Sequence, residues 1–434
     1  MKVLGFFALV LFIVLALFRH RWLIFAYIAS LGWIPYMAGE DIIGPVDLDD
    51  LILLSVCLLS IPKFISAGFR LGRLGKFAFI YWILSVISNT VAIFSHSMWV
   101  PFIFRQVLKD FTIMVFILIL ESDLREKSFA PQLGLALAIA AAGALFTTLL
   151  GYLFPGLGIA RALQEWSKLA SAVGGIRYGG ILYETYLSGA AMAPGFAMGL
   201  AVLIFGKRMI ISRTLALVAI PLIIVAVLAG QSRATYVAIV VMTLCAFMKP
   251  RRIILGVLAV IVGYYVINLS PDLSERLFGR IAVGGLAGRS ELWKGYLSRA
   301  PVGVFLLGEG YAAMSFRDFA GHMSYMEILA DTGVIGLILF TSLWYHVLTA
   351  TRRIVSSAET MEQLAIGRAA VWVSIAFLVS SAAIGLIVNN TYRLLFMIWL
   401  AIALAPAWEV PIEYEQLQMS NYDTASSEYG FSAV

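Results

Sequence analysis

Apolar runs long enough to cross a lipid bilayer recur along almost the whole chain, and they constrain its fold more than any other feature. The hydrocarbon core of a bilayer takes about 20 apolar residues of helix. Of the 434 residues, 61% are hydrophobic and 13% are charged, whereas soluble domains carry about 25% charged residues. The sequence therefore predicts an all-α polytopic membrane protein and excludes a soluble enzyme or a disordered chain. Two cysteines, both within apolar runs, cannot form a disulfide framework or a cysteine metal site.

The apolar runs predict about 12–13 transmembrane helices within a single integral-membrane domain that covers residues 1–434. A long hydrophilic loop at 270–322 precedes the last three helices, and an acidic tail follows at 409–434. The predicted helices are 3–18, 22–38, 48–62, 77–95, 102–120, 132–154, 187–205, 214–229, 234–248, 253–269, 323–348, 369–388 and 394–408.

Basic residues predict how the helices are oriented, because cytoplasmic loops carry an excess of Lys and Arg. One alternating set of loops is basic, and the short loops of the other set carry almost no Lys or Arg. The basic set, with the tail, is therefore predicted to be cytoplasmic. Its residues are Arg19, Arg21, Lys63, Arg70, Arg73, Lys76, Arg125, Lys127, Lys207, Arg208, Arg213, Lys249, Arg251, Arg252, Arg352, Arg353 and Arg368.

Two segments on the predicted outer side carry positive charge against this trend. The loop at 155–186 contains Arg177, and the long loop contains Arg276, Arg280 and Arg289. Long loops can be exported regardless of their charge, so orientation alone does not explain these residues. We interpret them as candidates for an anion site on the outer face.

Two arginine motifs on that side are candidate phosphate-binding sites. The first motif is the short outer turn Gly230–Ala234, which contains Arg233. The second is a predicted short helix over 288–297, in which Arg289, Trp293 and Tyr296 share one face. A guanidinium can bond two phosphate oxygens at once and stays charged at any relevant pH. The alternative for either arginine is a solvated anchor at the membrane surface.

The third motif begins where the long loop meets the next helix. Gly308-Glu309-Gly310 predicts a tight turn, and His322 stands at or before the first turn of the helix that follows. The positive end of a helix disfavours imidazolium, so His322 is a candidate general base. Glu327 and Asp331, one turn apart, are expected to hydrogen-bond polar neighbours inside the bundle.

Taken together, these motifs resemble the O-antigen ligase and polysaccharide polymerase superfamily. The resemblance rests on their order: Ser232-Arg233, Gly288-Arg289 with Trp293, Gly308–Gly310, and His322 with the run from Tyr325 to Gly336. It covers roughly residues 175–345, and the rest matches only in topology. Two residues depart from the family pattern, since Met323 stands where Asn is usual and Asp331 where Glu is usual.

The resemblance implies a multi-pass protein of the bacterial inner membrane that transfers a glycan on the periplasmic face with inversion. The donor would be an undecaprenyl-pyrophosphate-linked glycan, and neither a metal nor another cofactor would be needed. His322, Arg289 and Arg233 would be catalytic. Membrane lipids, a chain-length regulator and a flippase would be its partners, with no nucleic acid. Substrate-binding residues would be Arg177, Arg276, Arg280, Trp293 and Tyr296.

Several alternatives stay open at this point. The Arg177 segment favours a polymerase of O-antigen or exopolysaccharide repeat units over a ligase that transfers the glycan to the lipid A core. An alternative from another functional class is a lipid-linked glycan flippase or secondary transporter. A third is an assembly scaffold without catalysis. Arg105, Lys109 and Asp110 lie within an apolar run, and the sequence does not assign them a role.

Overall fold

The computed structural model describes about three-fifths of the chain, and none of the described residues lies in a β-strand. These residues are 20–33, 48–66, 71–96, 100–156, 178, 182, 185–206, 210–230, 232–247, 294–295, 298, 304–310, 324–382 and 390–408. Two predicted helices, 3–18 and 253–269, lie outside them, as do most of the long loop and the tail at 409–434.

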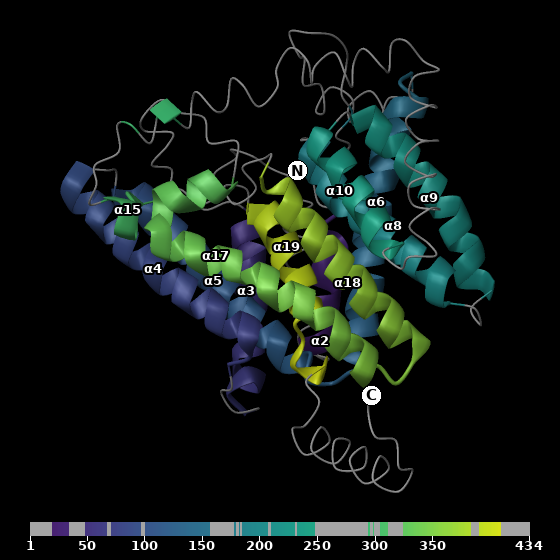
Figure 1. The fold of residues 1–434 in the computed structure, drawn as a ribbon, viewed down its shortest axis with the longest axis horizontal. Coiled ribbons are helices and arrows are strands. Elements are labelled where there is room, and N and C mark those ends of the chain that lie inside the picture. The colour runs from purple at the N-terminus through teal and green to yellow at the C-terminus, as the bar shows by residue number, and fades with distance from the viewer. Residues whose placement is uncertain are drawn as a thin grey trace, which may run out of the picture.

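The described residues form tilted helices that pack into one bundle (Figure 1). Helices α6, α8, α9 and α10 pack together on one side, and α4, α5, α15 and α17 on the other, while α18 and α19 lie between them. The elements are α2 (His20–Ser30), α3 (Leu48–Ser66), α4 (Arg73–His96), α5 (Val100–Asp123), α6 (Phe129–Leu153), α8 (Thr185–Phe205), α9 (Ile210–Gly230), α10 (Arg233–Ala246), α15 (Val304–Leu307), α17 (Ser324–Ser357), α18 (Met361–Ser380), α19 (Asn390–Ala403) and the 3₁₀ turn η3 (Pro406–Trp408).

Six of these helices are long and apolar enough to cross a membrane, which confirms a multi-pass membrane protein. A bilayer offers no water to the backbone, so each spanning segment must satisfy its own N–H and C=O groups, as a helix does. The six are Arg73–Phe94, Phe129–Leu153, Leu187–Phe205, Ser212–Gly230, Ser324–Ser357 and Met361–Ser380. Shorter apolar helices lie at Ile52–Pro62, Ala234–Ala246 and Arg393–Trp408.

The predicted boundary at the start of one helix is wrong. The hydropathy pattern predicts a helix over 369–388 after a loop that holds Arg368, but α18 begins at Met361 and includes Arg368. Thr360 caps the helix, because its hydroxyl accepts from the Gln363 N–H while the Gln363 side chain accepts from the Thr360 N–H. This capping box satisfies orphan donors of the first turn and outweighs the low hydropathy of the segment.

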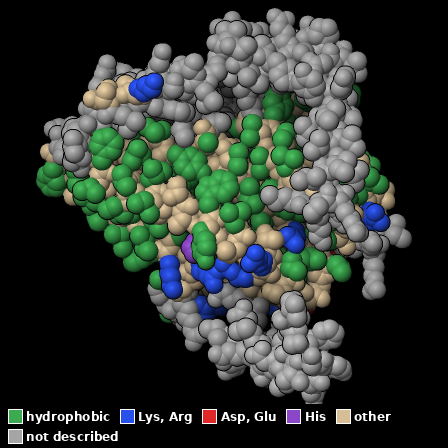
Figure 2. Space-filling model, viewed as in Figure 1, with side chains coloured by type: hydrophobic (Ala, Val, Ile, Leu, Met, Phe, Trp, Pro, Cys, Tyr) green, Lys and Arg blue, Asp and Glu red, His purple; other side chains and the backbone are tan. Residues whose placement is uncertain are grey.

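The helix ends predicted to be cytoplasmic lie together, and we call this side of the bundle the basic end. Arg21 of α2 pairs with Asp123, the last residue of α5, and with Glu126 just after it. Lys127 pairs with Glu359 between α17 and α18. Figure 2 shows Lys and Arg side chains gathered below the apolar surface of the bundle. These contacts join the start of α2, the end of α5 and the turn between α17 and α18. The alternation of the loops, and which side of a membrane this end faces, stay predictions.

A buried carboxylate ties α5 to α4 at the basic end. Glu121, which is 3% exposed, accepts from the backbone N–H groups of Gly72, Leu74 and Gly75 at 3.0–3.1 Å. Gly72 immediately precedes α4, and Leu74 and Gly75 lie in its first turn, where a helix leaves its N–H groups unsatisfied and its dipole favours an anion. Glu121 therefore anchors the start of a spanning helix.

Candidate functional site

The side chains of all eight predicted site residues lie outside the described part of the structure. For Arg233 the structure describes the backbone, as the first residue of α10, but not the side chain. The others are His322, Arg289, Arg177, Arg276, Arg280, Trp293 and Tyr296. Of the short helix predicted over 288–297, the structure describes only Lys294 and Gly295, and both are helical. The Ser298 hydroxyl donates to the Gly295 carbonyl.

The described neighbours of three predicted residues converge opposite the basic end. Tyr178, next to Arg177 in sequence, donates its N–H to the carbonyl of Ala229 at the end of α9. Ser380 of α18 donates its hydroxyl to the carbonyl of Ala234 in the first turn of α10. The N–H of Ser324, the first residue of α17, donates to the carbonyl of Ser381. Arg177, Arg233 and His322 thus lie in sequence next to described residues that contact the end of α9, the start of α10 and the end of α18.

The last two of these contacts limit how far apart the predicted motifs lie. Two hydrogen bonds and one peptide unit join Ala234 to Ser324, through Ser380 and Ser381. Their Cα atoms are therefore at most roughly 20 Å apart, given ordinary backbone dimensions. Ala234 and Ser324 lie 90 residues apart in sequence, and the C-terminal end of α18 brings them together.

The predicted Gly-x-Gly turn is present, and it packs against a break in α17. Gly308 and Gly310 have φ of 77° and 83°, and Gly333 within α17 has φ of 71°, a left-handed region that favours glycine. Because α17 breaks at Gly333, the carbonyls of Ala330 and Asp331 are available to the turn. They accept from the N–H groups of Glu309 and Gly310 at 2.7 and 3.1 Å.

The same turn also contacts α4. Ser88 donates its hydroxyl to the carbonyl of Leu307. A Cβ atom at Gly310 would meet the Ala92 Cβ at 2.7 Å and the Asn89 Oδ1 at 3.1 Å, so the turn leaves no room for a larger residue. The segment Val304–Gly310, within the long loop, therefore contacts both α4 and the break in α17.

A buried charged pair lies beneath this turn, between α5 and α19. The Arg393 Nη1 and the Asp110 Oδ1 are 2.5 Å apart, and the two side chains are 10% and 6% exposed. Asp110 also accepts from the Ser85 hydroxyl at 2.7 Å and from the Gln106 amide at 3.1 Å. Ion pairs inside membrane proteins are costly unless they are well partnered, and they commonly mark functional positions.

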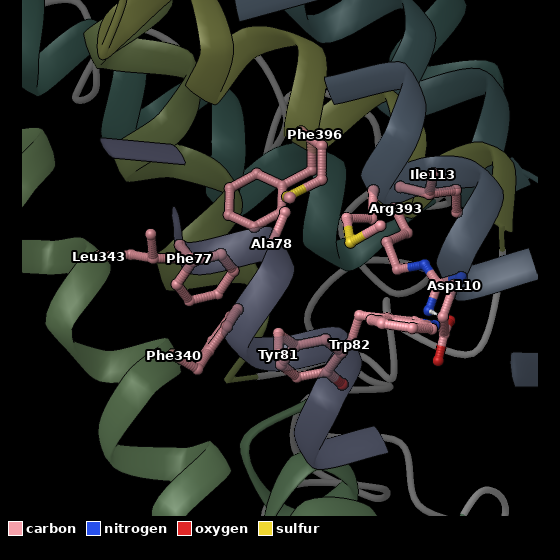
Figure 3. Close-up of a pocket in the computed structure, with 12 residues that line it drawn as sticks. Phe77, Ala78, Tyr81, Trp82, Asp110, Ile113, Phe340, Leu343, Arg393 and Phe396 are labelled. Carbon is pink, nitrogen blue, oxygen red and sulfur yellow. Dashed lines mark ion pairs between the residues drawn. The ribbon is translucent and has the colours of Figure 1, made fainter. Parts of the chain in front are cut away.

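Two cavities meet at this pair, one polar and one apolar. The polar cavity has a volume of about 10 Å³, room for about one water molecule, and is lined by Tyr81, Ser85, Asn89, Gln106, Asp110, Asp331, Thr332 and Arg393. The apolar cavity is larger, at about 50 Å³, and Figure 3 shows aromatic side chains such as Phe77, Phe340 and Phe396 around it. Tyr81, Asp110 and Arg393 line both.

The sequence analysis singled out Asp110 but not its partner. Arg393 falls one residue before the predicted helix 394–408, where it could be read as a loop residue, although α19 begins at Asn390. A lone arginine beside an apolar run was the only available signal. Asp331, predicted to contact polar neighbours, lines the polar cavity with Arg393, and Glu327 is buried. Within the described residues, no cluster of His, Cys, Asp or Glu is arranged to hold a metal ion.

Comparison with protein-family models gives no match to this chain, and comparison with curated proteins gives none either. The functional assignment therefore depends on the motifs of the sequence and on how the fold arranges them.

Proposed function

We propose that this protein is an inner-membrane glycosyltransferase that polymerises undecaprenyl-pyrophosphate-linked oligosaccharide repeat units on the periplasmic face. The observation that carries the proposal is the convergence of segments described above. Tyr178, Ala234 and Ser324 adjoin Arg177, Arg233 and His322, and all three lie at the end of the bundle opposite the basic end. Guanidinium groups and an imidazole meeting there would suit a lipid pyrophosphate and a sugar hydroxyl.

The proposed chemistry is a direct displacement at the anomeric carbon of the donor. The acceptor hydroxyl attacks this carbon, the bond from the carbon to the pyrophosphate oxygen breaks, and the configuration inverts. His322 takes the proton of the hydroxyl. Arg233 and Arg289 stabilise the charge that develops on the departing pyrophosphate, a term that is usually large in enzyme catalysis. Pyrophosphate is already a good leaving group, so the step requires no nucleotide and no divalent ion.

The proposal is tested by a transfer assay with the full-length protein in lipid nanodiscs. A lipid-pyrophosphate oligosaccharide supplied with EDTA and no nucleotide should give longer products by mass spectrometry. His322→Ala should lower the rate at least about 100-fold, the usual contribution of a general base, and Arg289→Ala should lower it by about 100-fold or more.

Two matched controls lie at the basic end of α17. His346→Ala and Arg353→Ala remove the same side-chain types from the distant end of the helix that follows His322, and they should leave the rate unchanged. Full activity in both His322→Ala and Arg289→Ala would refute the mechanism. A product that forms only when a lipid A core acceptor is added would identify a ligase instead of a polymerase.

A second candidate function, a lipid-linked glycan flippase or secondary transporter, is favoured by one specific observation. Transporters often combine a broken helix with ionisable residues inside the membrane. Here the break in α17 at Gly333 lies beside the cavity that holds Asp110 and Arg393. A transporter would move labelled glycan across sealed vesicles without forming a glycosidic bond, which the same product analysis would detect.

A further inference from the structure

We propose that the surface where α4 begins and α17 ends binds the phosphate headgroup of an anionic phospholipid, in the leaflet that the basic end faces. We call this surface the α4–α17 site. It goes beyond the proposed function and takes no part in it, since it lies at the end of α17 away from the proposed transfer chemistry. The site consists of Arg73, Lys76, His346, Thr349 and Arg353.

The packing of α4 against α17 places Arg73 beside His346. The two helices are in contact, and they run in opposite directions, because α4 begins at the basic end and α17 ends there. Phe77 of α4 and Leu343 of α17 line the same cavity, as Figure 3 shows. Arg73 lies one turn before Phe77, and His346 lies about one turn after Leu343. In agreement with this register, the Arg73 guanidinium lies within electrostatic range of the His346 ring.

Two more cationic side chains share these helix faces. His346, Thr349 and Arg353 are spaced three and four residues apart, which puts them on one face of α17. The Arg353 Nη2 donates to the Thr349 hydroxyl at 2.6 Å, a neutral partner that holds the guanidinium without cancelling its charge. On α4, Lys76 lies three residues after Arg73 and is exposed. Three cationic groups and one imidazole therefore gather where the two helices meet.

On the α2–α5 side of the basic end, by contrast, cations are neutralised within the protein. Arg21 pairs with Asp123 and Glu126, and Lys127 pairs with Glu359. These carboxylates are already committed to cations of their own. They therefore give the α4–α17 site little compensation.

The described residues supply no carboxylate to the α17 half of the site. None of them pairs with Arg353, and none lies within electrostatic range of His346. Glu121, the buried acid beside the start of α4, directs its carboxylate to backbone N–H groups. The excess positive charge at the site is therefore suited to an anion from outside the chain.

A lipid phosphate matches the chemistry of these side chains. A guanidinium can bond two phosphate oxygens at once, and an ammonium or imidazole N–H can donate to a further oxygen. An anion at the site would also relieve the repulsion between neighbouring cations. Basic pockets between transmembrane helices bind anionic headgroups in other membrane proteins.

The apolar surface that continues from the site favours a lipid over free phosphate. Ile80 and Ile83 lie on the face of α4 that carries Arg73 and Lys76, and they are 46% and 37% exposed. On α17, Leu348 is also exposed. Acyl chains can cover such side chains, whereas free phosphate gains nothing from them. Figure 2 shows a His side chain at the edge of the apolar surface, with Lys and Arg side chains next to it.

The experiment is native mass spectrometry of the full-length protein in detergent, titrated with phosphatidylglycerol or phosphatidylcholine. We expect phosphatidylglycerol to bind at least about tenfold more tightly, because each basic residue near the headgroup contributes about fivefold in affinity. Arg73→Gln with Arg353→Gln should lower the affinity for phosphatidylglycerol roughly 30-fold. Arg73→Lys with Arg353→Lys keeps both charges and should retain most of the binding. Equal affinity for the two lipids would overturn the proposal.

A matched double variant separates a site from diffuse attraction to a basic surface. Arg213→Gln with Lys127→Gln also removes two cations from loops and helix ends predicted to be cytoplasmic, near the start of α9 and after α5. It should change the affinity for phosphatidylglycerol by less than about twofold. Equal losses in the two glutamine double variants would show that no site exists at α4 and α17.

Two further measurements identify the occupant. A phosphatidylglycerol with a diazirine near its headgroup should label 73–80 and 342–353 in nanodiscs. If inorganic phosphate displaces this label, the site binds free phosphate and the proposal is wrong. A carbodiimide cross-link from Lys76 to the acidic tail at 409–434, formed even with the lipid present, would show that the tail occupies the site and would equally reject the lipid.

Discussion

The buried pair of Asp110 and Arg393 makes a quantitative prediction about stability. Removal of one partner of a buried ion pair typically costs about 3–5 kcal/mol, because the other charge is left in a low dielectric. In Arg393→Met, Asp110 keeps its hydrogen bonds from Ser85 and Gln106, so we expect the lower limit of about 3 kcal/mol. For a chain of this length that corresponds to a fall in Tm of roughly 3–6 °C.

The chain carries its own reporters for this measurement. Cys57 is buried and Cys245 is partly buried, so a thiol-reactive fluorescent dye reports unfolding of the detergent-solubilised protein on heating. The double variant Asp110→Asn with Arg393→Met removes both charges and should lose less stability than the sum of the two single variants. Such a shortfall is the signature of direct coupling.

A control pair and a refuting result complete the test. Lys127 and Glu359 form an exposed pair at 2.8 Å, and Lys127→Met should change stability by less than about 1 kcal/mol. If Arg393→Met melts within 1 °C of the unmodified protein, or if the two single effects add without coupling, the pair does not stabilise the bundle as argued here.

Two further predictions use the same melting assay. Glu121→Ala removes the acceptor of three backbone N–H groups, two of them in buried hydrogen bonds, and should cost at least about 1–3 kcal/mol. This is clearly more than Glu359→Ala should cost at the exposed pair, and equal shifts would contradict the capping role. Gly333→Ala places a Cβ within 2.3 Å of backbone and keeps a left-handed φ, so it should cost at least about 1–3 kcal/mol, whereas Gly156→Ala, with nothing within 4 Å, should be close to neutral.

Much of the membrane fold could be predicted from periodicity and hydropathy alone. The apolar runs at 132–154, 187–205 and 214–229 predicted α6, α8 and α9 to within a few residues. These predictions succeed because a bilayer forces each spanning segment to be helical and apolar. The start of α18 was missed because a capping box, not hydropathy, sets it.

The candidate site was only partly predictable. The positive φ of the turn at Gly308 and Gly310 follows from local sequence, and the structure has it. The break at Gly333 was not foreseen, since a glycine within an apolar run is also compatible with an unbroken helix. The roles of Arg289, Arg233 and His322 stay predictions.

The sequence by itself determined that the chain crosses a membrane several times and which of its helix ends carry the basic residues, because transfer into lipid is decided residue by residue along the chain. Only the tertiary structure decided that Arg393 would meet Asp110 and that Ala234, Ser324 and Ser380–Ser381 would meet at one end of α18. The partners of the pair are 283 residues apart in sequence. Such contacts depend on which helix faces pack together, and a hydropathy pattern contains no information about that choice.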